Sequence, residues 1–271
     1  MARLGLIAGG GGLPAAIADA CAREGRPVFV IRLKGSADAD LARFAGEDVG
    51  LAELGRCFKA LRQAGCDRVC FAGKVARPDF STLMPDLVGL RRLPAVAAAA
   101  RGGDDALLRA VLKVFETEGF VVEGVGEAAA GLALAAGPLG RLAPAAADEA
   151  DLRAALDGAL HIGASDQGQA AVARGGTVVA TEDQAGTDAL LVRVASLSGG
   201  PGGVLAKTPK PGQDLRVDLP TIGVATVERA AEAGLSGIVG PAGAVLVVDR
   251  AAVREAADRL GLFVFGAVAP S

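Results

Sequence analysis

The stretch that decides the fold lies close to the N-terminus and reads Leu4-Gly5-Leu6-Ile7-Ala8-Gly9-Gly10-Gly11-Gly12-Leu13-Pro14. An apolar run as long as one strand ends in four glycines, and Pro14 then favours the first turn of a helix. Gly10, Gly12 and Ala15 fit the G-x-G-x-x-G/A spacing of turns whose backbone N–H groups approach a pyrophosphate. The stretch predicts a strand, a phosphate-binding turn and a helix; a tight turn without ligand is the alternative.

Strand and helix patterns alternate along both halves, which indicates α/β domains with right-handed crossovers. In the first half we expect strands at Pro27–Leu33, Arg68–Ala72 and Phe120–Val122, and helices at Leu51–Gln63 and Asp104–Glu118. In the second half we expect helices at Glu149–Leu160, Gln167–Arg174, Thr226–Ala233 and Arg250–Leu260, and strands at Thr177–Thr181, Val204–Lys207, Ala244–Val248 and Leu262–Phe265. The predicted fold is two α/β domains: a Rossmann-like domain with a parallel sheet over residues 1–130, a linker over 131–147, and a catalytic domain over 148–271.

Composition narrows the class of protein. The chain carries 28 Lys plus Arg and 31 Asp plus Glu, a net charge of −3, which disfavours a nucleic-acid partner. Apolar residues make up 51% of the chain, enough for a sizeable core, so disorder is excluded. No uncharged apolar run reaches the roughly 18 residues of a membrane span, and no signal-peptide pattern opens the chain. We expect a cytoplasmic protein with reduced, buried cysteines.

Two short stretches of the first half carry charge near expected strand or helix ends. Lys74 and Arg77 follow the third strand, at the sheet edge where ligands bind, and suit a phosphate or are solvated surface cations. Asp104 and Asp105 precede the strongest helical pattern, which suits a helix cap and a first-turn acid; a catalytic role is the alternative.

Residues 182–226 combine carboxylates, cations and amides with four prolines. Asp214, Arg216 and Asp218 alternate, so they share one face if the backbone is extended. Carboxylates of this kind suit Mg²⁺ bound jointly with substrate phosphates, and nearby cations offset phosphate charge in a transition state. A salt-bridged loop or a dimer contact is the alternative.

The motifs together resemble a known family over nearly the whole chain. They are Leu6–Pro14, Gly73–Val75, Gly103–Asp105 with Leu107–Arg109, Glu116–Phe120, Gly168-Gln169, Gly186–Asp188, Lys207–Gly223 and Leu262–Val264. This order resembles the UDP-2,3-diacylglucosamine pyrophosphatase family of the LpxI type, from lipid A biosynthesis. The resemblance implies two domains with the lipid substrate between them. It implies hydrolysis to UMP and 2,3-diacylglucosamine 1-phosphate, with water attacking the α-phosphorus and Mg²⁺ or another divalent cation assisting. It also implies a homodimer, peripheral on the cytoplasmic face of the inner membrane.

The resemblance also implies roles for residues. Catalytic candidates are Asp188, Lys207, Asp214, Arg216 and Asp218, of which the three aspartates are also candidate metal ligands. Candidates for substrate binding are Gly10, Gly12, Lys74, Asp105, Gln169, Thr187, Lys210, Gln213 and Thr226. One position departs from the family pattern, because Ala225 stands where an acidic residue is expected. Since Ala neither binds a cation nor moves a proton, we expect a catalytically impaired chain that still binds substrate.

Two other functions compete with this interpretation. The glycine turn suits an NAD(P)-dependent oxidoreductase, but the second expected strand ends Arg32-Leu33-Lys34, without the acid that would bind the ribose of NAD. A non-catalytic protein that binds a lipid or a nucleotide is the second alternative.

Overall fold

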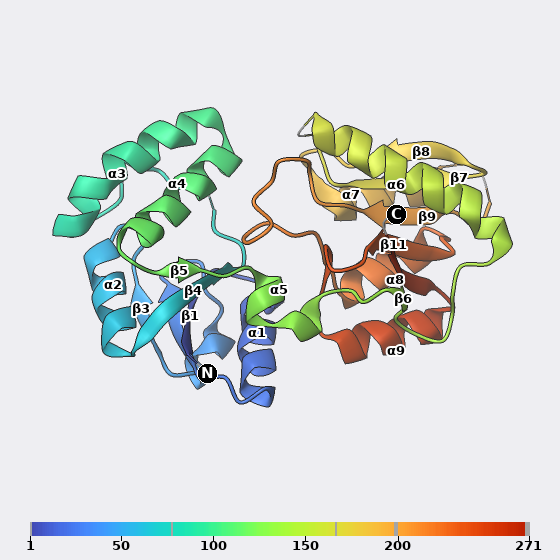
Figure 1. The fold of residues 1–271 in the computed structure, drawn as a ribbon. Helices are drawn as coiled ribbons and strands as arrows, with labels where there is room; N and C mark the ends of the chain where they lie inside the picture. The colour runs from blue at the N-terminus through green and yellow to red at the C-terminus, as the bar shows by residue number, and fades with distance from the viewer. Residues whose placement is uncertain (1, 77, 166, 198–199, 269–271) are drawn as a thin grey trace. The chain divides into compact units, whose positions relative to one another are not determined.

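The computed structural model describes residues 2–76, 78–165, 167–197 and 200–268. It divides into two compact units, Met1–Gly131 and Leu132–Ser271 (Figure 1). Each unit is an α/β domain with its own sheet, as the sequence predicts. No helix among the described residues is long and apolar enough to cross a membrane.

The first unit is built on a five-stranded parallel sheet in the order β3-β2-β1-β4-β5. The strands are β1 (Arg3–Ala8), β2 (Val28–Leu33), β3 (Gly46–Val49), β4 (Cys66–Ala72) and β5 (Val121–Val122). This order places β1 in the centre, with the chain running outward on one side and then on the other, as in a Rossmann fold. The predicted Rossmann-like parallel sheet is therefore confirmed.

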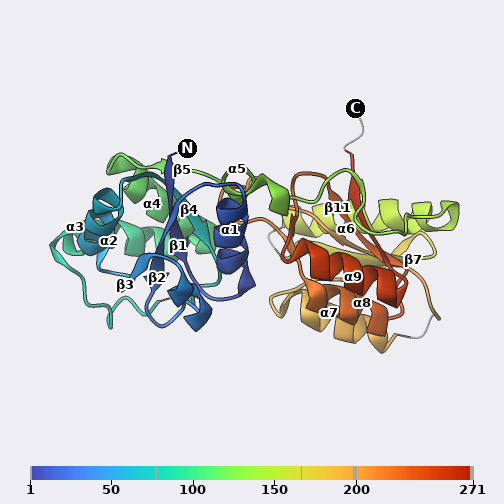
Figure 2. The same cartoon turned by 90° about the horizontal axis from the view of Figure 1, so that it is seen from below.

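Helices cover both faces of the first sheet. They are α1 (Gly12–Arg23), α2 (Leu54–Gln63), α3 (Leu87–Ala99), α4 (Asp104–Thr117) and the short α5 (Val125–Ala128), with 3-10 turns at Ala39–Arg43, Ala100–Gly102 and Ala130–Leu132. Figures 1 and 2 show α1 on one side of the sheet and α2, α3 and α4 on the other. The apolar stripe of α4 packs through Phe115, whose ring lies 5.0 Å from that of Phe58 and 4.9 Å from that of Phe71.

The second unit is built on a six-stranded mixed sheet in the order β6-β13-β11-β9-β7-β8. Its strands are β6 (Gly137–Pro138), β7 (Ala170–Arg174), β8 (Thr177–Thr181), β9 (Val204–Lys207), β11 (Gly237–Pro241) and β13 (Phe263–Ala267). Strands β9, β11 and β13 are parallel, whereas β6, β7 and β8 pair antiparallel. A separate parallel pair joins β10 (Thr221–Ile222) and β12 (Leu246–Val247).

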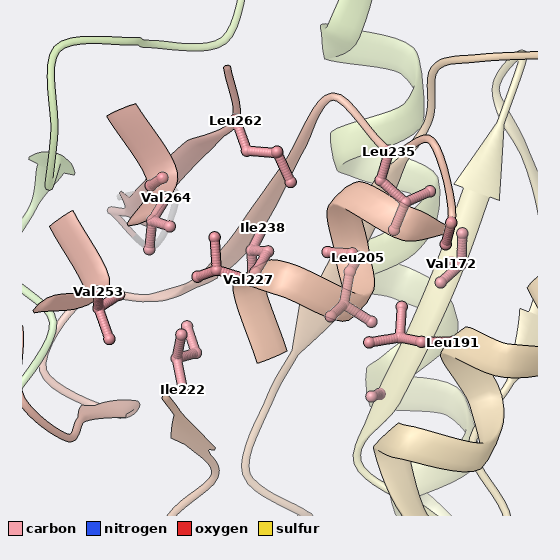
Figure 3. Close-up of a cluster of buried hydrophobic side chains, with 14 of the residues drawn as sticks. Val172, Leu191, Leu205, Ile222, Val227, Leu235, Ile238, Val253, Leu262 and Val264 are labelled. Atoms are coloured by element: carbon pink, nitrogen blue, oxygen red, sulfur yellow. The ribbon is translucent and has the colours of Figure 1, made fainter. Parts of the chain in front are cut away.

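Two helical layers enclose this second sheet. They consist of α6 (Glu149–Ala164) on one face and α7 (Gly186–Ala195), α8 (Val224–Glu232) and α9 (Arg250–Leu260) on the other, with a 3-10 turn at Ala146–Asp148. Because side chains alternate along a strand, Ala171 and Ala173 pack with α6 while Ala170 and Val172 join the larger core. Figure 3 shows that larger core, where Leu205 and Ile238 of the sheet meet side chains of the three helices.

Some local expectations differ from the structure. The helix expected at Gln167–Arg174 is wrong, because Ala170–Arg174 form β7. Alanines favour a helix locally, but here the run is buried on both faces, as in a central strand. Strand β3 and helix α3 were not predicted.

The segment 131–147, expected to be a linker, contributes to the second unit. Leu134 is fully buried in the larger core, and its N–H donates to the carbonyl of Val245 over 2.8 Å. Gly137–Pro138 form β6, which pairs with the edge of β13. All four cysteines are buried and free, as expected.

Candidate functional site

The glycine turn after β1 is joined to the loop after β4 by backbone contacts. Gly10 and Lys74 exchange two hydrogen bonds, each 2.8 Å from N to O. Gly9 must lack a side chain, because a Cβ there would lie 2.5 Å from the carbonyl oxygen of Lys74. The turn therefore brings two predicted substrate residues, Gly10 and Lys74, together at the carboxyl edge of the first sheet, with Gly12 as the first residue of α1.

Carboxylates already occupy the positions near this turn where phosphate is expected. The N–H of Gly11, at the start of α1, donates to Oδ2 of Asp38 over 2.8 Å. The two cations at the carboxyl end of β2 are also paired: Arg32, within the strand, with Asp48 at 2.6 Å, and Lys34, directly after it, with Glu53 at 3.0 Å. A phosphate bound at this turn would replace the Asp38 carboxylate at the helix N-terminus.

Asp105 lies in the first turn of α4, where a negative charge suits the helix dipole. Its Oδ2 lies 2.5 Å from Nη2 of Arg109, one helical turn further on. The arrangement matches the expected first-turn acid. Asp104 begins the same helix, and Arg77 lies outside the described residues.

In the second unit, a buried carboxylate organises two predicted substrate residues. Glu182 directly follows β8 and is only 7% exposed. Its Oε2 accepts from the backbone N–H of Gln169 over 2.8 Å, and its Oε1 accepts from the Thr187 hydroxyl over 2.8 Å. Glu182 thus fixes the strand entering β7 and the first turn of α7 to the end of β8. Glu182 was not predicted as a site residue from the sequence.

Buried polar groups continue from Gln169 to the end of β9. The N–H of Thr208 donates to the carbonyl of Gln169 over 2.9 Å. Lys207, 6% exposed, donates from Nζ to the carbonyl of Thr221 over 2.9 Å. Burying an ammonium group costs free energy unless the group is hydrogen-bonded, and the Thr221 carbonyl provides such a bond. The fold therefore holds a positive charge at the end of β9, away from the surface. Thr187, Gln169 and Lys207 are therefore linked through their immediate neighbours.

The loop after Lys207 is a series of turns, not an extended segment. Asp214 accepts from the N–H of Arg216 through Oδ1 over 3.1 Å, and its carbonyl accepts from Val217 and Asp218. The guanidinium of Arg216 also binds both carboxylate oxygens of Asp214, with Nη2 to Oδ2 at 2.7 Å. The sequence placed Asp214, Arg216 and Asp218 on one face only for an extended backbone, and this condition is not met, because the Asp214 side chain stabilises a turn.

Gln213 links the two ends of this loop by side-chain hydrogen bonds. The Gln213 side chain accepts from the backbone N–H of Lys210 over 3.0 Å and donates to Oδ2 of Asp218. Lys210 and Asp218 are thereby held by one glutamine.

The starts of α7 and α8 carry the remaining candidates. Asp188, exposed in the first turn of α7, lies 3.5 Å from Nη2 of Arg229 on α8. Ala225 is exposed in the first turn of α8, four residues before Arg229. Thr226 accepts from the N–H of Gly223 over 3.3 Å and so caps this helix. Position 225 therefore lies on the same helical face as the arginine that contacts Asp188.

The described residues do not form a complete protein cage for a metal ion. Across residues 2–76, 78–165, 167–197 and 200–268, no three His, Cys, Asp or Glu side chains gather as a metal site. The three expected ligands have separate partners: Arg229 for Asp188, Arg216 for Asp214 and Gln213 for Asp218. The described side chains thus do not fit Mg²⁺ held by protein ligands alone.

Comparison with known proteins identifies the family. A family model described as the LpxI N-terminal domain matches residues 3–132, and one described as the LpxI C-terminal domain matches residues 135–265. The chain belongs to the LpxI family. It is similar to the UDP-2,3-diacylglucosamine pyrophosphatase LpxI of Caulobacter vibrioides, with 57% identity over an alignment of 273 positions that covers 98% of each chain.

The two LpxI domains coincide closely with the two compact units, whose boundary lies between Gly131 and Leu132. Most candidates in the LpxI C-terminal domain lie at helix starts or in the loop after β9. A sequence signal for Glu182 did exist. It is a carboxylate directly after a predicted strand and five residues before Thr187, and the end of a strand is a common place for site residues.

Proposed function

We propose that this chain hydrolyses the pyrophosphate bond of UDP-2,3-diacylglucosamine, giving UMP and 2,3-diacylglucosamine 1-phosphate for lipid A biosynthesis. The observation that carries the proposal is the match of both LpxI domains, together with 57% identity to a pyrophosphatase across nearly the whole of both chains. The chemistry of the second unit supports it. A buried ammonium at Lys207 suits a site that stabilises charge on a phosphoryl group.

The reaction divides into tasks that side chains of this chain perform. Lys207 supplies positive charge from a fixed position, since the Thr221 carbonyl holds its ammonium. Glu182 accepts a hydrogen bond from the Thr187 hydroxyl, so that the first turn of α7 is held in place before substrate arrives. A preorganised positive charge such as that of Lys207 stabilises a transition state without rearranging at the moment of reaction.

We further propose that turnover depends on Mg²⁺ or another divalent cation. Mg²⁺ keeps several waters and is commonly bound through one or two carboxylates together with substrate phosphates, which a diphosphate substrate supplies. Removing divalent cations with EDTA should abolish UMP release, and added Mg²⁺ should restore it. Full turnover in EDTA would overturn this part of the proposal.

Ala225 is proposed to impair the chain. An acid at the same place in α8 would sit in a first turn that now has none. If that acid supplies several kcal/mol in the transition state, restoring it raises the rate about tenfold for each 1.36 kcal/mol. Ala225→Asp should therefore release UMP much faster than the natural chain, while Ala225→Asn, of similar size but neutral, should not.

The deciding experiment measures UMP release from UDP-2,3-diacylglucosamine in detergent micelles by the natural chain and by Ala225→Asp. Release by either chain supports the hydrolase. If neither chain releases UMP, the alternative of a non-catalytic binding protein is favoured. The observation behind that alternative is Ala225, which stands where an acidic residue is expected from the family pattern. In ¹⁸O-water, attack at the α-phosphorus, as expected from the resemblance, puts the label in UMP. Label in the lipid 1-phosphate would overturn that detail and leave the overall reaction intact.

Partners and location complete the proposal. We propose a homodimer that associates peripherally with the cytoplasmic face of the inner membrane, where a diacylated substrate resides. Light scattering of the purified chain tests the dimer, and fractionation of cells tests the membrane association. Each acyl chain contributes about 0.8 kcal/mol per buried CH₂, so we expect lipid to be retained through purification and found by mass spectrometry of an organic extract.

A further inference from the structure

The solvent-facing side of α3 is apolar. Its exposed residues are Leu87, Leu90, Arg91, Pro94, Ala95 and Ala98, which we call the α3 face. Their spacing of three, four and seven residues places them along one side of the helix. The opposite side carries the buried Gly89 and Val96. Leu87 is 78% exposed, Leu90 is 57% exposed and the preceding Met84 is 88% exposed.

This pattern differs from that on a neighbouring helix, whose exposed side is charged. Figure 1 shows α2 and α3 on the same side of the first sheet. Helix α2 buries Phe58 and Leu61 and exposes Arg56, Lys59 and Arg62. A surface helix of a globular protein ordinarily turns its apolar stripe to the core, as α2 does. Large exposed apolar patches mark interaction surfaces. The α3 face, which the first unit leaves exposed, is therefore a candidate interaction surface.

Positive charge on and beside the α3 face indicates an anionic partner. Arg91 lies on the face, and the exposed Arg101 follows the helix. Within the described part of the chain neither has a carboxylate partner, whereas Arg92 of the same helix pairs with Glu118 at 3.1 Å. The acid nearest to Arg91 in sequence, Asp86, caps α3 by accepting from the N–H groups at positions 88 and 89, and Asp105, four residues after Arg101, pairs with Arg109. The surface is thus apolar and cationic.

We propose that the α3 face and Met84 dock onto the surface of an anionic lipid bilayer. The inference rests on the proposed function, because a substrate with two acyl chains is held in a bilayer. Apolar side chains enter the interface while arginines attract anionic headgroups, as in helices that lie in the plane of a membrane. A second copy of the chain fits the face less well. A two-fold contact centred on the middle of α3 would bring the Arg91 side chains of both copies close to each other.

Vesicle flotation tests this surface. The purified chain is mixed with phosphatidylcholine vesicles that contain or lack phosphatidylglycerol, without substrate. We expect binding to the anionic vesicles, little binding to the neutral ones, and loss of binding in high salt. Leu87→Ser combined with Leu90→Ser should weaken binding by at least about tenfold, because each leucine loses its apolar contribution. Arg91→Glu should abolish the preference for anionic vesicles.

A matched control and two further measurements keep the outcomes separate. Leu160→Ser combined with Val179→Ser changes two exposed apolar residues of the second unit and should leave binding unchanged. Far-UV circular dichroism checks that all variants are folded. Equal vesicle binding by the natural chain and the Leu87/Leu90 variant would overturn the proposal. So would conversion of a dimer to a monomer by that variant, because the face would then be a protein interface.

The same variants separate this inference from the proposed reaction. UMP release from micellar substrate is measured in parallel with flotation. Vesicle binding without UMP release by either the natural chain or Ala225→Asp contradicts the reaction and leaves the docking surface intact. UMP release by a chain that does not bind anionic vesicles contradicts the docking surface and leaves the reaction intact.

Discussion

Removing the carboxylate of Glu182 should destabilise the second unit and loosen the candidate site in one step. The carboxylate is almost fully buried and accepts two hydrogen bonds of 2.8 Å, from the Gln169 N–H and the Thr187 hydroxyl. Both donors belong to other elements, so Glu182 connects β7, β8 and α7. We consider Glu182→Ala, Thr187→Val and the double variant.

The size of the effect follows from these two bonds. A hydrogen bond to a charged group contributes about 1.5–3 kcal/mol, and a buried donor left without a partner costs about 1–3 kcal/mol. Glu182→Ala loses both bonds and orphans the Gln169 N–H, so we expect a loss of about 3–5 kcal/mol in the free energy of unfolding. Thr187→Val alone should cost about 1.5–3 kcal/mol, because one donor to the buried carboxylate disappears.

The double variant carries the decisive information. With Glu182 already absent, the Thr187 hydroxyl has no carboxylate to bind, so adding Thr187→Val should cost little more. We expect a coupling energy of about 1.5–3 kcal/mol between the two positions. Simple additivity of the two losses would refute the reasoning, since it would mean that the hydrogen bond contributes nothing in solution.

Urea unfolding followed by far-UV circular dichroism measures these losses, because the chain has no Trp or Tyr to report by fluorescence. Glu149→Ala is the matched control. Glu149 is exposed and pairs with Arg153 one helical turn away at 3.0 Å, so its removal should change the free energy of unfolding by less than about 0.5 kcal/mol. In the Ala225→Asp background, which we expect to be active, Thr187→Val should raise KM or lower kcat, and the control should change neither.

Three further predictions concern the first unit. Burial raises the pKa of Cys57 and Cys70 to about 12. Their contribution to the free energy of unfolding is therefore complete below the ordinary 9.0 and lost as pH rises toward 12. Alkylation of the native chain at mildly alkaline pH should spare both thiols, and rapid alkylation would contradict this. The hydrogen bond from Arg62 lowers the pKa of Glu118, so its contribution is present above the ordinary 4.5 and lost as pH falls further; Glu118→Gln should flatten the acid side of the stability profile, and an unchanged slope would count against it. Gly9→Ala should cost about 1–3 kcal/mol, because its Cβ meets backbone that cannot move aside; an unchanged urea midpoint would show that the turn can relax.

The regular parts of the fold could be predicted because their sequences carry strong periodic signals. β1, the glycine turn and α1 follow from an apolar run, four glycines and a proline. β3 was missed because Gly46–Val49 is short and polar, as suits an edge strand that need not be apolar on both faces. α3 was missed because its outward side is as apolar as its buried side, so no period stands out.

Within the candidate site, sequence supplied the residues but not their pairing. The alternation of Asp214, Arg216 and Asp218 indicates one face only if the backbone is extended. Instead the Asp214 side chain accepts from the N–H of Arg216, and the Asp214 carbonyl accepts from the next two N–H groups, so the segment turns. Pro211-Gly212, just before Asp214, was a turn signal in the same stretch. The role of Glu182 depends on Gln169, thirteen residues away, and no local pattern encodes that contact.

The effect of an acid at position 225 has two possible origins, and the structure shows how to separate them. Arg229 now lies 3.5 Å from Asp188 and one helical turn from position 225. An aspartate at 225 would pair with Arg229 at i,i+4 spacing and draw it from Asp188. If the gain from Ala225→Asp arises by releasing Asp188, then Arg229→Gln in the natural chain should raise turnover by a similar factor. If the carboxylate at 225 itself takes part in the reaction, Arg229→Gln alone should give no gain, and Ala225→Asp should still accelerate UMP release when combined with it.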